Sequence, residues 1–179
     1  PGLMDVLLAA FADINQIESY TPVNVGFSII PALTSGQVQA VMGPFKTYET
    51  VIMAQHGLKA GYFEIEKYGI PDYDELIFVA GAQAIVDKKD AIQRFVLAVA
   101  EGIAFLKSNP KEAMNLYFNA VPDADRNMET EAFKLTKPYF ANDQKLAPER
   151  WQKFADFALS NKLIRSSVDV STLLKYAPK

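Results

Sequence analysis

The expected fold rests on the stretch VQAVMGPFKTYE, residues 38–49, in which an apolar run meets a Gly-Pro break and then a helix start. Phe45, Tyr48 and Glu49 are three and four residues apart, so on a helical turn they share one side. Two aromatic faces beside one carboxylate suit a flat heterocycle with an amino group, because the rings stack and the carboxylate accepts the N–H. The alternative is ordinary packing, with Phe45, Tyr48 and Ile52 as a core stripe and Glu49 at the positive end of its helix.

Composition limits the class of protein. The chain has 179 residues, half of them hydrophobic, and a net charge of −3, which excludes a disordered protein and gives no general attraction to nucleic acid or anionic membrane. Cysteine is absent and His56 is the only histidine, so disulfides, thiol catalysis and nitrogen- or sulfur-rich metal sites are excluded. No apolar run is long enough to cross a bilayer. We expect no metal, no cofactor and no nucleic-acid partner.

Apolar periodicity alternates between two spacings in the first part of the chain. Strands are expected at residues 20–27, 38–42, 60–65 and 75–80. Helices are expected at residues 3–11, 30–35 and 47–56, and further helices begin near residues 90, 110, 126 and 148. Short strands that alternate with short helices are typical of βαβ units. The sequence therefore predicts an α/β fold with a mainly parallel or mixed sheet, followed by a helical C-terminal part.

Two further residues are candidates for binding. Gly2 lies in the turn before the first helix, where exposed N–H groups would face an anion. Tyr73 lies in the break between the α/β and helical parts, where a two-lobed protein keeps its hinge and ligand cleft; the alternative is a tyrosine that packs in the seam. The chain has no Gly-x-Ser-x-Gly, no Walker loop and no Gly-x-Gly-x-x-Gly, so no catalytic residue is assigned. The sequence thus offers candidate binding residues but no catalytic motif, which favours a binding protein over an enzyme.

Four segments carry a family resemblance. They are VNVGF at 23–27, PALTSGQVQAV at 31–41, KYGIPDYDEL at 67–76 and PERWQKFAD at 148–156. Together they resemble the thiamine-pyrimidine precursor-binding proteins and pyrimidine synthases, the NMT1/ThiY-like family. The resemblance implies a type II periplasmic-binding-protein-like fold with two lobes. Residues 1–75 would form the ligand-facing second lobe, and residues 76–179 the hinge return strand and the C-terminal helices of the first lobe.

The resemblance also implies a function. It predicts the solute-binding component of an ABC importer, which takes a hydroxymethylpyrimidine- or formylaminopyrimidine-type ligand in the interlobe cleft and presents it to the permease. The location would be periplasmic or extracellular and membrane-associated. The family's ligand motif, aromatic-aromatic-Asn-aromatic-Glu, reads here as residues 45–49. Phe45, Tyr48 and Glu49 match it by type, whereas Lys46 and Thr47 depart from it. Lys46 would favour an anionic or phosphorylated group.

Other readings stay open at this point. A pyrimidine synthase of thiamine biosynthesis would use a histidine, a lysine and a cysteine-rich motif, and a sister binder would take a sulfonate, nitrate or riboflavin. The chain begins at Pro1-Gly2 and enters a helical pattern at once, so we expect that the N-terminal portion of the first lobe and a signal sequence lie outside it. Apolar helices left uncovered would then favour homo-oligomers.

Overall fold

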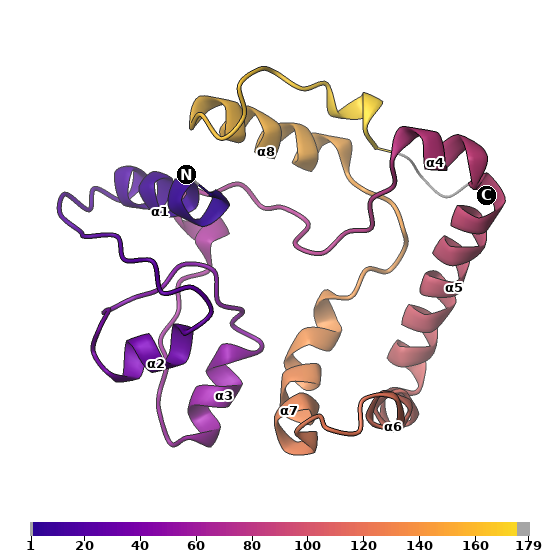
Figure 1. Ribbon diagram of the computed structural model, residues 1–179, viewed down its shortest axis with the longest axis horizontal. Coiled ribbons are helices and arrows are strands. Elements are labelled where there is room, and N and C mark those ends of the chain that lie inside the picture. The colour runs from indigo at the N-terminus through magenta and orange to yellow at the C-terminus, as the bar shows by residue number, and fades with distance from the viewer. Residues whose placement is uncertain (1, 175–179) are drawn as a thin grey trace. The chain divides into compact units, whose positions relative to one another are not determined.

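All the regular secondary structure is helical in the computed structural model, which describes residues 2–174 (Figure 1). The α-helices are α1 (Leu3–Ile14), α2 (Ile29–Thr34), α3 (Glu49–Gln55), α4 (Ala82–Asp87), α5 (Lys89–Ser108), α6 (Pro110–Ala120), α7 (Arg126–Thr136) and α8 (Pro148–Ser160). The 3-10 helices are η1 (Ile65–Tyr68), η2 (Lys137–Tyr139) and η3 (Val170–Thr172). No β-strand occurs within residues 2–174.

The predicted α/β, type II periplasmic-binding-protein-like fold with a sheet is therefore wrong for the described residues. The four runs predicted as strands lie outside the α-helices and form no ladder. A strand exists only where a neighbour bonds its N–H and C=O groups, and apolar character does not supply that neighbour. In the run at 75–80, Leu76 and Val79 are 87% and 84% exposed. In a parallel sheet that is buried on both faces, both side chains would be covered.

The predicted helices are confirmed, with boundaries shifted by a few residues. The pattern at residues 3–11 extends to Ile14 as α1, and the pattern at 47–56 shortens to α3. Pro110 occupies the first turn of α6, where its missing N–H leaves no helical hydrogen bond unmade. Asp125 caps α7, since its carboxylate accepts from the N–H groups of Asn127 and Met128 at 2.9 and 3.0 Å.

The chain divides into two compact units. Unit 1 comprises Pro1–Tyr73 with Pro148–Val170, and unit 2 comprises Asp74–Ala147 with Ser171–Lys179. All five predicted ligand residues fall in unit 1. The assignment of residues 1–75 and 76–179 to two lobes stays a prediction.

The core of unit 1 forms around α1. Leu7, Ala10 and Ile70 are almost completely buried, and partly buried apolar side chains surround them: Leu3, Phe11, Met42, Ile65 and Phe157. Phe157 comes from α8 and Met42 from the loop before α3, so segments far apart in sequence meet on one helix face. Through Met42, this packing contacts the loop that leads to Phe45, Tyr48 and Glu49.

Unit 2 is built from α4 to α7. Phe118 of α6 is buried, and the guanidinium of Arg126 lies 4.6 Å from the centre of its ring, within the range of a cation–π contact. Lys107 of α5 reaches the segment after η2, where its ammonium donates to the carbonyls of Phe140 and Ala141 at 2.6 and 3.0 Å. It also donates to the side-chain oxygen of Asn142 at 2.7 Å.

Candidate functional site: the Phe45–Glu49 turn

The Phe45–Glu49 turn, residues 45–49, is closed by hydrogen bonds in both directions. The backbone N–H of Phe45 donates to Oε2 of Glu49 at 2.7 Å. The carbonyl of Phe45 accepts from the N–H groups of Tyr48 and Glu49 at 3.0 and 3.1 Å. Glu49 is the first residue of α3, where the helix dipole favours a negative charge. The carboxylate is thereby held in one position.

One oxygen of this carboxylate remains available within the described part of the chain. Oε2 accepts from Phe45, whereas no hydrogen bond from residues 2–174 reaches Oε1. Glu49 is half-buried. A half-buried oxygen of this kind is suited to accept from a donor on a ligand.

The aromatic residues of the turn are not core residues. Phe45 and Tyr48 are 44% and 37% exposed, and the buried residue of α3 is Val51. The core-stripe alternative for Phe45, Tyr48 and Ile52 is therefore not what this structure shows. The dipole explanation for Glu49 does hold, because the residue opens its helix, and it is compatible with a binding role.

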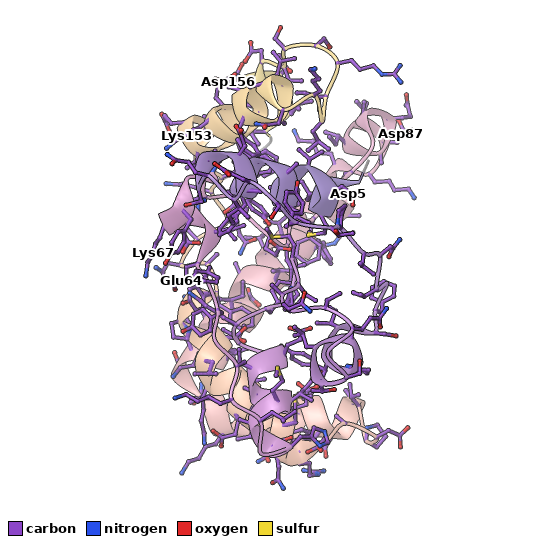
Figure 2. The ribbon with its side chains drawn as sticks, turned by 90° about the vertical axis from the view of Figure 1, so that its left-hand side faces the viewer. Asp5, Glu64, Lys67, Asp87, Lys153 and Asp156 are labelled. Carbon is purple, nitrogen blue, oxygen red and sulfur yellow. The ribbon has the colours of Figure 1, made fainter. Side chains whose placement is uncertain are left out.

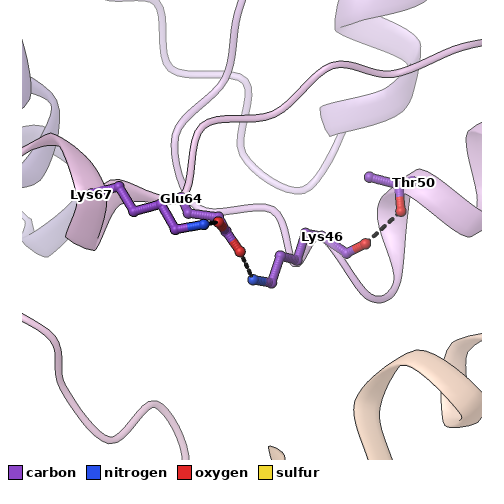
Figure 3. Close-up of polar contacts among 4 residues, drawn as sticks. All are labelled: Lys46, Thr50, Glu64 and Lys67. Carbon is purple, nitrogen blue, oxygen red and sulfur yellow. Dashed lines mark hydrogen bonds and ion pairs between the residues drawn. The ribbon is translucent and has the colours of Figure 1, made fainter. Parts of the chain in front are cut away.

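Two lysines converge on one carboxylate beside the turn. The ammonium of Lys46 pairs with Oε1 of Glu64, and that of Lys67 pairs with Oε2 (Figure 3). Glu64 precedes η1, and its side chain lies next to that of Lys67 (Figure 2). The hydroxyl of Thr50 in α3 donates to the carbonyl of Lys46, so the lysine backbone is attached to the first turn of that helix.

The ion-pair cluster of Lys46, Glu64 and Lys67 stabilises the charged forms of Glu64 and Lys67. The hydrogen bond from Lys46, and then that from Lys67, lowers the pKa of Glu64 to about 2. In return, the Glu64 carboxylate raises the pKa of Lys67. Glu64 is therefore ionised throughout the neutral range.

Gly2 lies at the start of the same unit. It is the N-cap of α1, and its N–H donates to Oδ2 of Asp5 at 2.9 Å. The negative group that faces this helix start in the structure is thus Asp5 itself. Met4, in the first turn of α1, lies close to the loop before the Phe45–Glu49 turn: its sulfur is 3.0 Å from where a Cβ on Gly43 would stand. Gly43 has φ +108°, a backbone conformation that favours glycine.

Tyr73 packs against α8. Its ring lies 4.8 Å from the ring of Phe154, at an interplanar angle of 46°, and it has additional contacts within the protein. This ring contact lies within unit 1, and packing of Tyr73 in a seam between two lobes stays a prediction. Ligand binding by Tyr73 and by Gly2 stays a prediction, as does the location of the site in a cleft.

Glu64 is the residue that sequence reasoning missed. Two signals were present: the unexpected Lys46 inside an otherwise matching motif, and the i, i+3 spacing of Glu64 and Lys67. Neither signal identifies the partner of Lys46, which lies 18 residues away.

Two other classes of site find no support in residues 2–174. No group of three or more acidic, histidine or cysteine residues is placed to hold a metal ion there. Within the same range, none of the helices combines the length and apolar character that a membrane span requires.

Comparison with known proteins identifies the family. Residues 4–113 match the NMT1/THI5-like family, and this chain belongs to it. The matched range includes the Phe45–Glu49 turn and the ion-pair cluster. The resemblance drawn from the four sequence segments is thus confirmed.

Two relatives have names that refer to thiamine biosynthesis or to pyrimidine binding. A Haemophilus influenzae protein named for thiamine biosynthesis is 33% identical over 165 residues, which cover 91% of this chain and 51% of the relative. The formylaminopyrimidine-binding protein of Halalkalibacterium halodurans is 27% identical over 125 residues, which cover 70% of this chain and 37% of that protein. The chain matches about half of the first relative's length and less of the second's.

Proposed function

We propose that this protein binds an aminopyrimidine precursor of thiamine and passes it to an ABC permease outside the cytoplasm, without a chemical step. The Phe45–Glu49 turn carries the proposal. Oε1 of Glu49 accepts the exocyclic amino group, and the exposed rings of Phe45 and Tyr48 pack on the faces of the heterocycle. The formylaminopyrimidine-binding relative supports the ligand class.

The closed turn explains how a half-exposed site can select a ligand. The Phe45 N–H holds Oε2, so Glu49 loses little side-chain freedom when a ligand arrives. The ligand amino group therefore meets an acceptor that is already oriented. This arrangement recognises a donor on a flat ring.

Calorimetry on the full-length protein tests the proposal, with hydroxymethylpyrimidine and formylaminopyrimidine as ligands. Glu49→Gln is the informative variant, because its amide oxygen can still accept from Phe45 while its NH₂ group opposes the ligand amino group. We expect a loss of about 1.5–3 kcal/mol, or about ten- to a hundredfold in affinity. Glu18→Gln, which changes an exposed carboxylate elsewhere in unit 1, is the matched control.

Three outcomes would contradict the proposal in different ways. Unchanged affinity in Glu49→Gln would show that Glu49 does not contact the ligand. Absence of binding by the wild type would show that aminopyrimidines are not its ligands. Turnover of the pyrimidine would establish an enzyme instead. Native mass spectrometry of the intact protein, purified without added ligand, gives an independent check, since a bound aminopyrimidine would appear as a released mass after denaturation.

A further inference from the structure

We propose that Glu64 is a specificity-determining residue, which makes the Phe45–Glu49 turn select an uncharged aminopyrimidine over its phosphate ester. The inference rests on the proposed function and narrows its ligand class. From the sequence, Lys46 inside the ligand motif favours an anionic ligand group. The inference concerns whether Lys46 has that effect in the folded protein.

The first step of the argument is the position of Lys46. It follows Phe45 directly, and its carbonyl accepts from Thr50 in the first turn of α3. The lysine is thus part of the turn that carries Glu49. A free ammonium at this position would be the natural partner of a ligand phosphate.

The second step is that this ammonium is already paired. Lys46 contacts one oxygen of Glu64, and Lys67 contacts the other. The side chains of Lys46 and Glu64 are only 27% and 21% exposed, whereas that of Lys67 is 67% exposed. The less exposed pair is the one next to the turn, where solvent screens it less.

The third step is the balance of charge. Glu49 and Glu64 together offset Lys46 and Lys67, so the turn and the ion-pair cluster have no net charge. A phosphate would have to displace the Glu64 carboxylate from Lys46 and would also meet the negative charge of Glu49. An uncharged pyrimidine needs neither change, because it uses only the acceptor and the rings.

The experiment compares hydroxymethylpyrimidine with its phosphate ester by calorimetry on the full-length protein. For the wild type we expect binding of the uncharged compound to be stronger by about tenfold or more. In Glu64→Gln, Lys46 loses its anionic partner, so binding of the phosphate ester should improve by about three- to tenfold. Affinity for the uncharged compound should change by less than about twofold.

A second variant keeps the test decisive if Glu64→Gln folds poorly. Lys46→Met combined with Glu64→Gln removes the ion pair and keeps the net charge, and we expect both wild-type affinities to persist within about twofold. A large loss of phosphate-ester binding in this double variant would show that Lys46 is a phosphate ligand and would overturn the inference. Glu66→Gln removes an exposed carboxylate two residues from Glu64. This variant controls for the change in net charge that Glu64→Gln causes.

The outcomes separate this inference from the proposed function. Equal or stronger binding of the phosphate ester by the wild type overturns the role of Glu64 and leaves the aminopyrimidine class in place. An unchanged ratio of the two affinities in well-folded Glu64→Gln does the same. If the wild type binds neither compound, both proposals are wrong.

Discussion

The backbone N–H of Phe45 donates to the Glu49 carboxylate four residues ahead, at 2.7 Å. This contact joins the loop before α3 to the first residue of that helix and uses one of the two carboxylate oxygens. A residue that stabilises a helix start and one that reads a ligand are usually considered as alternatives. Here Oε2 of Glu49 accepts from the backbone, and we propose that Oε1 accepts from the ligand.

Glu49→Ala should therefore reduce stability as well as ligand binding. The Phe45 N–H loses its acceptor at a helix start, where such losses cost about 0.5–2 kcal/mol. Urea denaturation of the ligand-free protein measures the change. Glu49→Gln retains an acceptor and should stay within about 0.5 kcal/mol of the wild type; equal destabilisation by both variants would argue against the hydrogen bond.

Glu64 should make stability sensitive to acid. Its pKa is lowered from 4.5 to about 2 in the folded protein by Lys46 and Lys67. A carboxylate with a depressed folded pKa contributes stability above its unfolded pKa, and that contribution disappears as the pH falls from 4.5 to about 2.

The measurement is the free energy of unfolding of the wild type and Glu64→Gln at several pH values between 2 and 7. We expect the difference between the two proteins to be largest near neutral pH and to diminish through this acid range. Glu18→Gln provides the comparison for an exposed carboxylate. A pH-independent difference would mean that the cluster is not formed in solution.

Gly69 is a position that only glycine fits. Its φ is +94°, and a Cβ there would stand 2.6 Å from Cγ2 of Ile14. Gly69→Ala should destabilise the protein by about 1–3 kcal/mol, from backbone strain and overpacking together. Thermal or urea denaturation measures the loss.

Gly57 separates the two contributions. It has φ +72° but open space around its missing Cβ, so Gly57→Ala carries backbone strain of about 1 kcal/mol without the clash. The double change Gly69→Ala with Ile14→Ala should recover part of the clash energy. No recovery would show that the conflict with Ile14 is absent.

Lys107 should stabilise the segment that follows η2. Its ammonium donates to two carbonyls and to the side chain of Asn142, and hydrogen bonds from a charged donor contribute about 1.5–3 kcal/mol at most when desolvated. Since these groups are largely exposed, we expect Lys107→Met to lose about 1 kcal/mol. Lys111→Met, at an exposed position on α6, is the matched control.

Hydrogen exchange locates the effect. Amides at residues 137–145 should exchange faster in Lys107→Met than in the wild type, while those of unit 1 keep their protection. A uniform increase in the amide exchange rates across the chain would instead indicate a general loss of stability.

Self-association of this 179-residue chain is a further expectation. Phe27 is fully exposed, and Leu76 and Val79 are more than four-fifths exposed; uncovered apolar side chains of this size favour association. Light scattering should show a mass that rises above 19.9 kDa with concentration. A constant monomer mass would count against this expectation, and Leu76→Ser with Val79→Ser should reduce any association found.

Local sequence determined the helices and the Phe45–Glu49 turn. The apolar periodicity of α1, Pro110 at the start of α6 and the acidic residues before α7 act through neighbours within one or two turns. For the same reason the sequence alone predicts that Phe45, Tyr48 and Glu49 lie together, because residues three and four positions apart share one side of a helical turn. The four family segments were also sufficient to identify the family.

Only the tertiary structure decided the contacts between distant segments. The run at 75–80 has the composition of a strand, yet pairing depends on a neighbour that composition does not specify. Glu64 meets Lys46 across 18 residues, and Ile14 meets Gly69 across a longer interval. Such contacts follow from how the elements pack around α1, and no local spacing encodes them.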